Sequence, residues 1–267
     1  MFSGSHNLPL ISKHLYMVFK CAPSTIHADY LLTRHADPQG RIYPTRSLFT
    51  KLLRNRLCTQ TVLEAICRAP CVVVPCYDTG GPVELPRRLF RTLQSRSTNP
   101  WTSQDSPLPF LRYLYNNSRI SAPDPSSHDG YALTKAVSVG FMPLVRFLLD
   151  KGASPGRKGG MAVHVAIRRR DLSLVKMLIE PDTTPIHEQE SETANVASAG
   201  GKRKRDAGKV EDGKKSTKRR RLEDRIKVDQ AMLKAAVICD ARDIVKYFMD
   251  EKSVMPDMQT LRHMRGR

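Results

Sequence analysis

The sequence predicts an all-α protein, a helical repeat solenoid that is interrupted by one disordered insert. Three observations lead to this class. Segments 131–155 and 161–180 superimpose at an offset of 30 residues, and 231–252 superimposes on the first segment at an offset of 100. Each copy carries apolar residues at helical spacing, which indicates two short amphipathic helices. The stretch between the second and third copies is polar, highly charged and free of aromatic residues, as disordered segments are.

The amino-terminal part, residues 10–120, is expected to contain degenerate copies of the same helical unit. Amphipathic patterns occur at 12–20, 47–69, 86–94 and 109–117. Their signature residues agree poorly with those of the clear copies, so the sequence does not fix the number of units in this part.

Residues 128–180 contain the two clear copies. In the first copy, Pro143 suits the first turn of the second helix and Gly152 suits a left-handed helix end. Asp171 is expected to cap the second helix of the next copy. A pair of helices this short cannot bury its apolar stripe alone, so the copies must stack on one another.

These residues resemble ankyrin repeats. The stretch LVRFLLDKGASP at 144–155 is similar to the closing half of an ankyrin unit, and YLLTRHADPQG at 30–40 resembles the same ending, with His35 at the family's Gly position. The resemblance implies that 12–20 is the inner helix of that first unit and that His164 hydrogen-bonds a turn. The signature positions in this chain are Leu133, Ala136, Leu148, Gly152, His164, Ala166, Leu178 and Ala236.

The copies also depart from the family pattern. The Thr-Pro turn is absent from all three copies, and the period is 30 where the family has 33. The missing residues fall between Gly152 and Met161, so the hairpin that projects from such repeats is expected to be short. A generic helical bundle is the alternative architecture, because amphipathic helix pairs are common.

Repeat spacing locates the insert at 181–227. The second and third copies are offset by 70 residues, which exceeds one period of 30 by 40. The first half of the insert is acidic. Residues 202–221 then hold eleven Lys or Arg against three Asp or Glu, in a chain of net charge +18. An insertion in a repeat connection costs little stability, because loop-closure entropy grows only logarithmically with length.

The basic tract is similar to a bipartite nuclear import signal, with two basic clusters separated by twelve residues. Import adaptors bind such signals as an extended chain, so a nuclear protein with an import adaptor as partner is predicted. Two alternatives are a contact with nucleic-acid phosphates and a solvated linker that nothing reads. The predicted signal residues are Lys202, Arg203, Lys204, Arg205, Lys214, Lys215, Lys218, Arg219, Arg220 and Arg221.

The third copy, 228–255, is the terminal repeat, and 256–267 is a basic tail. Leu233, Ala236 and Phe248 occupy the slots that Leu133, Ala136 and Leu148 occupy in the first copy. The tail ends in LRHMRGR and adds positive charge.

No enzymatic activity, cofactor or metal is predicted. The glycines at 80–81 lack the Lys-Ser/Thr of a phosphate-binding loop. Cys67, Cys71 and Cys76 cluster but lack a second pair of ligands at zinc spacing, so reduced, at least half-buried thiols are expected. The amino end does not have the pattern of a secretory signal, and the apolar runs are too short to span a membrane. A soluble protein made in the cytosol is expected.

The predicted function is a non-enzymatic protein–protein interaction module. Repeat arrays bind partners on their concave surface. Arginines at 168–170 make that surface basic and favour an acidic partner, although they equally suit a merely solvated surface. The alternative function is a basic protein of chromatin or RNA that binds phosphates through the insert. The candidate partner-binding residues are Tyr131, Lys135, Ser138, Val139, Arg168 and Arg169.

Overall fold

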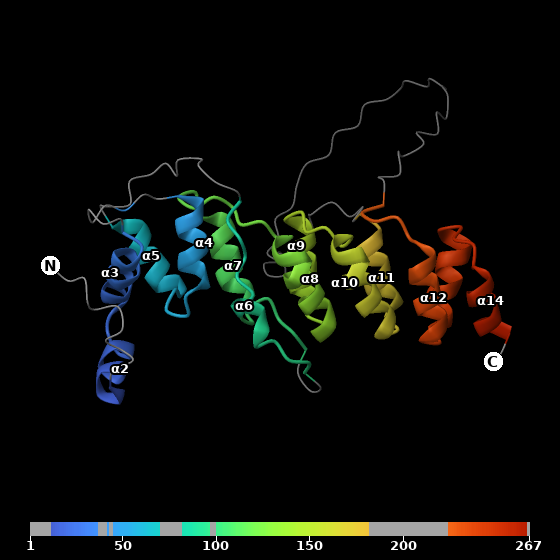
Figure 1. Ribbon diagram of the computed structural model, residues 1–267, viewed down its shortest axis with the longest axis horizontal. Coiled ribbons are helices and arrows are strands. Elements are labelled where there is room, and N and C mark those ends of the chain that lie inside the picture. The colour runs from blue at the N-terminus through green and yellow to red at the C-terminus, as the bar shows by residue number, and fades with distance from the viewer. Residues whose placement is uncertain are drawn as a thin grey trace, which may run out of the picture.

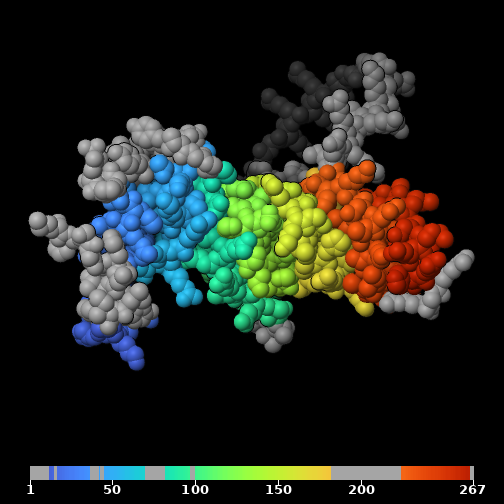
Figure 2. All heavy atoms as spheres, viewed as in Figure 1, coloured from blue at the N-terminus to red at the C-terminus, as the bar shows by residue number. Residues whose placement is uncertain are grey.

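The computed structural model describes residues 12–36, 42, 45–69, 82–96, 100–181 and 224–265. These residues are mostly helical and contain no β-strand, although an isolated bridge joins Glu84 and Asp124. The prediction of an all-α protein is therefore confirmed. The described helices follow one another along an elongated body, with α2 and α3 at one end and α14 at the other (Figure 1, Figure 2).

The described helices are short, as the spacing of the apolar residues predicted. In chain order they are α2 (Lys13–Lys20), α3 (Ser24–Arg34), α4 (Arg46–Arg54), α5 (Gln60–Arg68), α6 (Arg88–Arg91), α7 (Leu108–Asn116), α8 (Ser127–Val139), α9 (Met142–Asp150), α10 (Arg157–Arg168), α11 (Leu172–Ile179), α12 (Gln230–Ile238), α13 (Arg242–Lys246), the π-helical turn η2 (Tyr247–Glu251) and α14 (Met258–Arg265).

From α8 onward the helices form two rows (Figure 1). The first-helix row consists of α8, α10, α12 and α14, each packed on the one before it. The second-helix row consists of α9, α11 and α13 with η2. Each second helix packs on the first helix of its own pair. The pairs correspond to the copies predicted at 128–180 and 228–255.

Buried residues repeat with the period found in the sequence. The close contacts between first helices are made by alanines, because Ala136, Ala166 and Ala236 are fully buried at equivalent positions. Their buried neighbours are Ala132, Leu133 and Val137 in α8, Ala162, Val163 and Ile167 in α10, and Met232, Leu233 and Val237 in α12. The copies therefore share one stacking register, with a single continuous core.

The predicted ends of the second helices are confirmed. Pro143 lies in the first turn of α9. The side chain of Asp171 accepts a hydrogen bond of 3.0 Å from the amide of Leu174 and so caps α11. Gly152 has a φ of 88°, the left-handed conformation expected after α9.

The first helices end at a recurrent left-handed residue that the sequence comparison did not identify. The φ angle is 75° at Gly140, 55° at Arg170 and 53° at Asp240, and these residues are equivalent at offsets of 30 and 100. A side chain in this conformation costs roughly 1 kcal/mol, less for Asp than for most residues. The second and third copies therefore carry backbone strain where the first copy has glycine.

A left-handed turn lies within the first residues of α8 and of α10. Residues 128–130 have φ angles of 56°, 59° and 71°, and residues 158–160 have 54°, 63° and 70°. In the second copy this turn lies between Gly152 and Met161, where a short hairpin was expected. The third copy replaces the turn with Asp229, whose side chain accepts a hydrogen bond of 2.8 Å from the amide of Met232.

The amino-terminal helices are arranged differently from the predicted units. Helix α3 packs on α5, and α2 contacts α3 through Phe19, whose ring centroid lies 4.9 Å from that of His27 and 5.0 Å from that of Tyr30. The imidazole Nε2 of His27 also bonds the carbonyl of Phe19 at 2.7 Å. These contacts fix a sharp turn between the helices, so α2 extends away from the stack (Figure 1). The predicted pairing of 12–20 with 30–40 is not formed.

A half-buried arginine, Arg88, joins the segments predicted as separate degenerate units. Segment 47–69 forms α4 and α5. Arg88 donates through Nε to the carbonyl of Leu53 at 2.6 Å and through Nη2 to that of Cys58 at 2.8 Å. Burial raises the pKa of Cys58 to about 12, so its thiol stays protonated beside the guanidinium. Arg88 therefore satisfies one carbonyl at the end of α4 and one in the connection between α4 and α5.

Candidate functional site

Five of the six predicted partner-binding residues are accessible on α8 and at the end of α10. Tyr131, Lys135 and Ser138 are half-buried on α8, while Arg168 and Arg169 are exposed. Helices α8 and α10 are adjacent in the first-helix row, and Ser138 and Arg168 are equivalent positions. We call the surface formed by these five residues the basic face.

Arg169 connects the two helices of the basic face. Its Nη1 donates a hydrogen bond of 2.9 Å to the carbonyl of Ser138. Its Nη2 would lie 2.7 Å from a Cβ atom placed on Gly140, so the contact depends on glycine at that position. Because Arg169 satisfies a carbonyl at the end of α8, it stabilises the stack and is only partly available to a partner.

Val139 does not belong to the basic face, and its prediction as a surface contact is wrong. The side chain is 6% exposed, because the chain turns inward directly after α8. The carbonyl of Val139 accepts a hydrogen bond of 3.3 Å from the indole of Trp101. That indole stacks on Phe141 at 4.4 Å between ring centroids and lies 3.8 Å from the guanidinium carbon of Arg96.

Sequence reasoning missed Arg87, which lies beside the basic face. Its guanidinium carbon is 5.5 Å from the ring centroid of Tyr131, because α6 packs against α8. Arg91, four residues later, is exposed at the end of α6. The basic run RRLFR at 87–91 is visible in the sequence. Its position next to Tyr131 depends on a tertiary contact between distant segments.

Arg168 of the basic face and the neighbouring Arg170 leave this surface positively charged. Arg168 and Arg170 are exposed, and neither forms an ion pair with another described residue. Uncompensated positive charge on one face attracts acidic groups and speeds their association. His164, half-buried on α10, makes no hydrogen bond within the described part of the chain, so the turn contact implied by the resemblance is not found.

The chain leaves and re-enters the repeat stack at one place. The amide of Arg225 donates to the carbonyl of Ile179 at 2.7 Å, and its Nη1 donates to the carbonyl of Met177 at 2.8 Å. Repeat spacing assigned residues 224–227 to the insert. In the structure Arg225 and Ile226 instead pack against the repeat stack at the point where the insert ends. Residues 182–223 connect these two points and lie outside the described residues.

Lys252 holds both ends of the insert together. Its Nζ lies 2.9 Å from both carboxylate oxygens of Asp224 and 3.2 Å from Oε1 of Glu180. The hydroxyl of Tyr247 donates to the same Glu180 oxygen at 2.8 Å. We call these four residues the clamp.

The clamp favours one protonation state at neutral pH. Burial acts to raise the pKa of Glu180, but hydrogen bonds from Tyr247 and Lys252 lower it overall. Burial acts to lower the pKa of Lys252, but its hydrogen bonds to Asp224 and Glu180 raise it overall. Burial and the Glu180 carboxylate raise the pKa of Tyr247. The clamp thus joins the ionised carboxylate of Glu180, the ammonium of Lys252 and the neutral phenol of Tyr247.

All ten predicted import-signal residues, between Lys202 and Arg221, lie outside the described residues. Cys71 and Cys76 also lie outside them, while Cys67 is buried and its sulfur accepts a hydrogen bond of 3.9 Å from the amide of Asn117. The import signal and the cysteine cluster as a whole stay predictions.

Within the described ranges, no group of His, Cys, Asp and Glu side chains is arranged to hold a metal ion. The described helices include none with the length and apolar character needed to cross a membrane. Comparisons with protein-family models, with curated proteins and with solved structures give no match to this chain. The basic face is the surface available to a partner, and the clamp holds the two ends of the insert together.

Proposed function

We propose that the protein is an ankyrin-type repeat scaffold that binds an acidic protein partner on its basic face. The observation that carries this proposal is the exposed guanidinium of Arg168, which forms no ion pair with another described residue, on a stack of paired helices. Helix pairs that repeat every 30 residues and share one buried register support the repeat architecture.

The composition of the basic face favours a protein over a small molecule. Tyr and Arg are enriched among the residues that dominate the energy of protein interfaces. Tyr131 is already oriented by Arg87, so it loses less conformational freedom on binding than a mobile side chain would. Lys135 and Arg168 supply charge for association with an acidic surface.

Site-specific crosslinking tests this proposal. A photoreactive amino acid at position 135 or 168 is expected to capture a protein from nuclear extract, and the matched probe at the exposed Arg146 of α9 is not. A photoreactive amino acid at position 131 is expected to capture the same protein. The double substitution Lys135→Glu and Arg168→Glu should abolish that capture, because the new carboxylates repel acidic groups. Equal capture from α8 and α9 would contradict a partner on the basic face.

We also propose that the basic insert directs the protein to the nucleus. Two basic clusters in a connection whose ends lie together support this role, because such a segment can be read apart from the repeat stack. In a fluorescent fusion, changing Lys204, Arg205 and 218–221 to Ala is expected to abolish nuclear accumulation. Unchanged accumulation would contradict the proposal.

The alternative is a nucleic-acid-binding protein that uses the insert itself. The local charge of +8 in Lys202–Arg221, eleven basic against three acidic residues, is the observation that favours it. Binding of the intact chain to a DNA or RNA duplex that survives about 0.2 M salt would favour the alternative, since non-specific phosphate contacts weaken steeply with salt. Binding that vanishes at that salt concentration would favour the protein scaffold.

A further inference from the structure

The exposed large apolar side chains of the described residues gather at the two ends of the elongated body. At the amino-terminal end, Met17 and Val18 of α2 are 54% and 57% exposed. At the other end the exposed residues are Ile238, Met249, Met255, Met258 and Leu261. Repeat stacks whose ends are apolar tend to associate, because end repeats normally carry a polar outer face.

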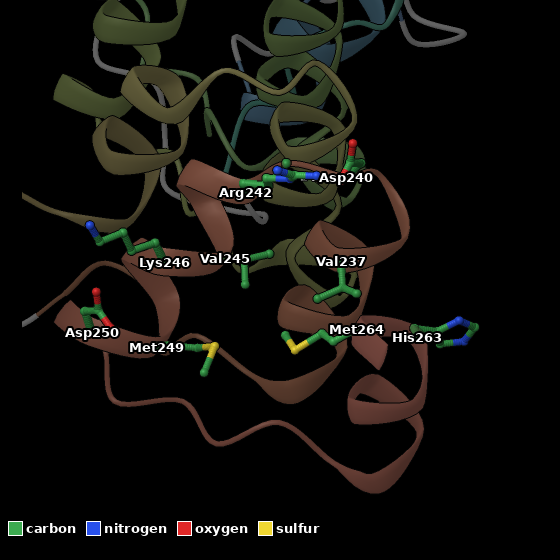
Figure 3. Close-up of a pocket in the computed structure, with 10 residues that line it drawn as sticks. Val237, Asp240, Arg242, Val245, Lys246, Met249, Asp250, His263 and Met264 are labelled. Carbon is green, nitrogen blue, oxygen red and sulfur yellow. Dashed lines mark ion pairs between the residues drawn. The ribbon is translucent and has the colours of Figure 1, made fainter. Parts of the chain in front are cut away.

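The carboxyl-terminal end contains a groove of about 500 Å³ between α12, α13 with η2, and α14. Val237, Val245, Met249 and Met264 point into it, while Lys246 and Asp250 lie at one rim (Figure 3). The charged pair Arg242 and Asp240 closes another side at 3.6 Å. The groove is therefore apolar along its floor and charged at its edges.

The two helical rows explain why a groove lies here. In the first-helix row α14 covers α12, with Thr260 buried and Lys234 donating to Gln259 at 2.6 Å. In the second-helix row α11 is covered by α13 with η2, but no described helix covers η2 in turn. The groove is the position of the next second helix, so the occupant that it fits is a short amphipathic helix.

Helix α2 has the properties that this position requires. It contains eight residues, as α11 does, and it is amphipathic. It projects from the stack (Figure 1) and exposes Met17 and Val18 at 54% and 57%, while Ile26 of the neighbouring α3 is 49% exposed. Its charges, Lys13 and Lys20, stand at its two ends, and the groove has a carboxylate on each of two sides, Asp250 beside Lys246 and Asp240 beside Arg242. The helix and the groove are thus complementary in length and polarity, and the two carboxylates offer partners for the two lysines.

We infer that the chain associates head to tail, with α2 of one copy in the carboxyl-terminal groove of a second copy. The two surfaces lie at opposite ends of one molecule (Figure 1, Figure 2), so α2 cannot reach the groove of its own chain. A head-to-tail contact uses two different surfaces, so it leaves one of each free and builds open chains.

Sedimentation velocity of the full chain over a wide concentration range tests this inference. Wild-type protein is expected to form a ladder of species at multiples of 30.1 kDa. Val18→Glu, on α2, and Met249→Lys, in the groove, should each weaken association about tenfold or more, because each places a charge in an apolar contact. Ile238→Lys is the matched control, since Ile238 is 52% exposed at the same end but does not line the groove.

Mixing the two variants decides between possible geometries. Val18→Glu protein retains an intact groove and Met249→Lys protein retains an intact α2, so the mixture is expected to form one-to-one dimers and no longer chains. A wild-type chain that stays monomeric would overturn the inference. So would association that Val18→Glu leaves unchanged, association that Ile238→Lys abolishes equally, or a mixture that does not form the dimer.

Discussion

The main-chain amide of Arg225 donates a hydrogen bond of 2.7 Å to the carbonyl of Ile179, across 46 positions of sequence. Ile179 is the last residue of α11, whose final carbonyls have no partner within the helix. The chain that returns from the insert therefore caps the helix from which the insert departs. This contact makes the repeat stack continuous across the insert.

Removal of the insert is expected to leave the fold intact. Replacing 182–223 with a short Gly-Ser linker should preserve cooperative unfolding and raise the free energy of unfolding by about 2 kcal/mol at most, because the closed loop becomes shorter. Trp101, the single tryptophan of the chain, reports unfolding in urea by its fluorescence. A Gly-Ser segment as long as 182–223 is the control and should match the wild type. Loss of cooperative unfolding would show that the insert is part of the core.

Lys252→Met is expected to destabilise the protein by about 1–2 kcal/mol, because it leaves Glu180 and Asp224 without their cation. The carboxylates are 40% and 36% exposed, and solvent screening keeps the cost below that of a fully buried pair. Lys246→Met, an exposed lysine on α13, is the control and should change stability little.

The same variant is expected to alter the acid sensitivity of the fold. The pKa of Glu180 is lowered in the folded state. Its stabilising contribution is therefore present above the ordinary carboxylate pKa and is lost as pH falls through the lowered value. Urea unfolding between neutral and acidic pH should show a smaller loss of stability for Lys252→Met than for the wild type. Parallel pH profiles would contradict the role given to Lys252.

Gly140→Ala is expected to cost more than Gly152→Ala. Both glycines have positive φ angles, 75° and 88°, so each substitution adds strain of roughly 1 kcal/mol. At Gly140 the new Cβ would also lie 2.7 Å from Nη2 of Arg169, whereas nothing lies within 4 Å at Gly152. Thermal unfolding should show the larger decrease for Gly140→Ala. In an Arg169→Ala background the difference between the two substitutions should disappear.

Ala236→Asp is expected to abolish folding of the terminal repeat, while Ala235→Asp is tolerated. Ala236 is fully buried between stacked first helices, and an unpaired carboxylate there costs several kcal/mol. Ala235 is half-buried at the neighbouring position. Circular dichroism and limited proteolysis of the two variants measure the difference. Equal effects of the two substitutions would contradict the stacking register.

The parts of the fold that the sequence predicted depend on local rules. The alanines at 136, 166 and 236 and the helix ends at Pro143 and Asp171 follow from patterns within a few residues, and the structure contains them as expected. The pairing of 12–20 with 30–40 failed for a different reason. It assumed that these helices pair side by side, whereas the contact of Phe19 with His27 fixes a turn that sends α2 away from the repeat stack.

The candidate site shows the same division. Lys135 and Arg168 were predictable as accessible, because their positions follow from the helical period of α8 and α10. Val139 was misplaced, because the turn after α8 buries it and Trp101 binds its carbonyl. Arg87 was missed, because its contact with Tyr131 joins segments 44 residues apart.

By itself, the sequence determined the helical class, the 30-residue period and the buried positions that the copies share, because each depends on apolar residues at regular local spacing. Only the tertiary structure decided that α3 pairs with α5, that Arg169 joins α8 to α10, and that a groove remains beside η2. These features depend on side chains that meet across long stretches of sequence, where the outcome is set by shape and by unsatisfied carbonyls rather than by periodicity.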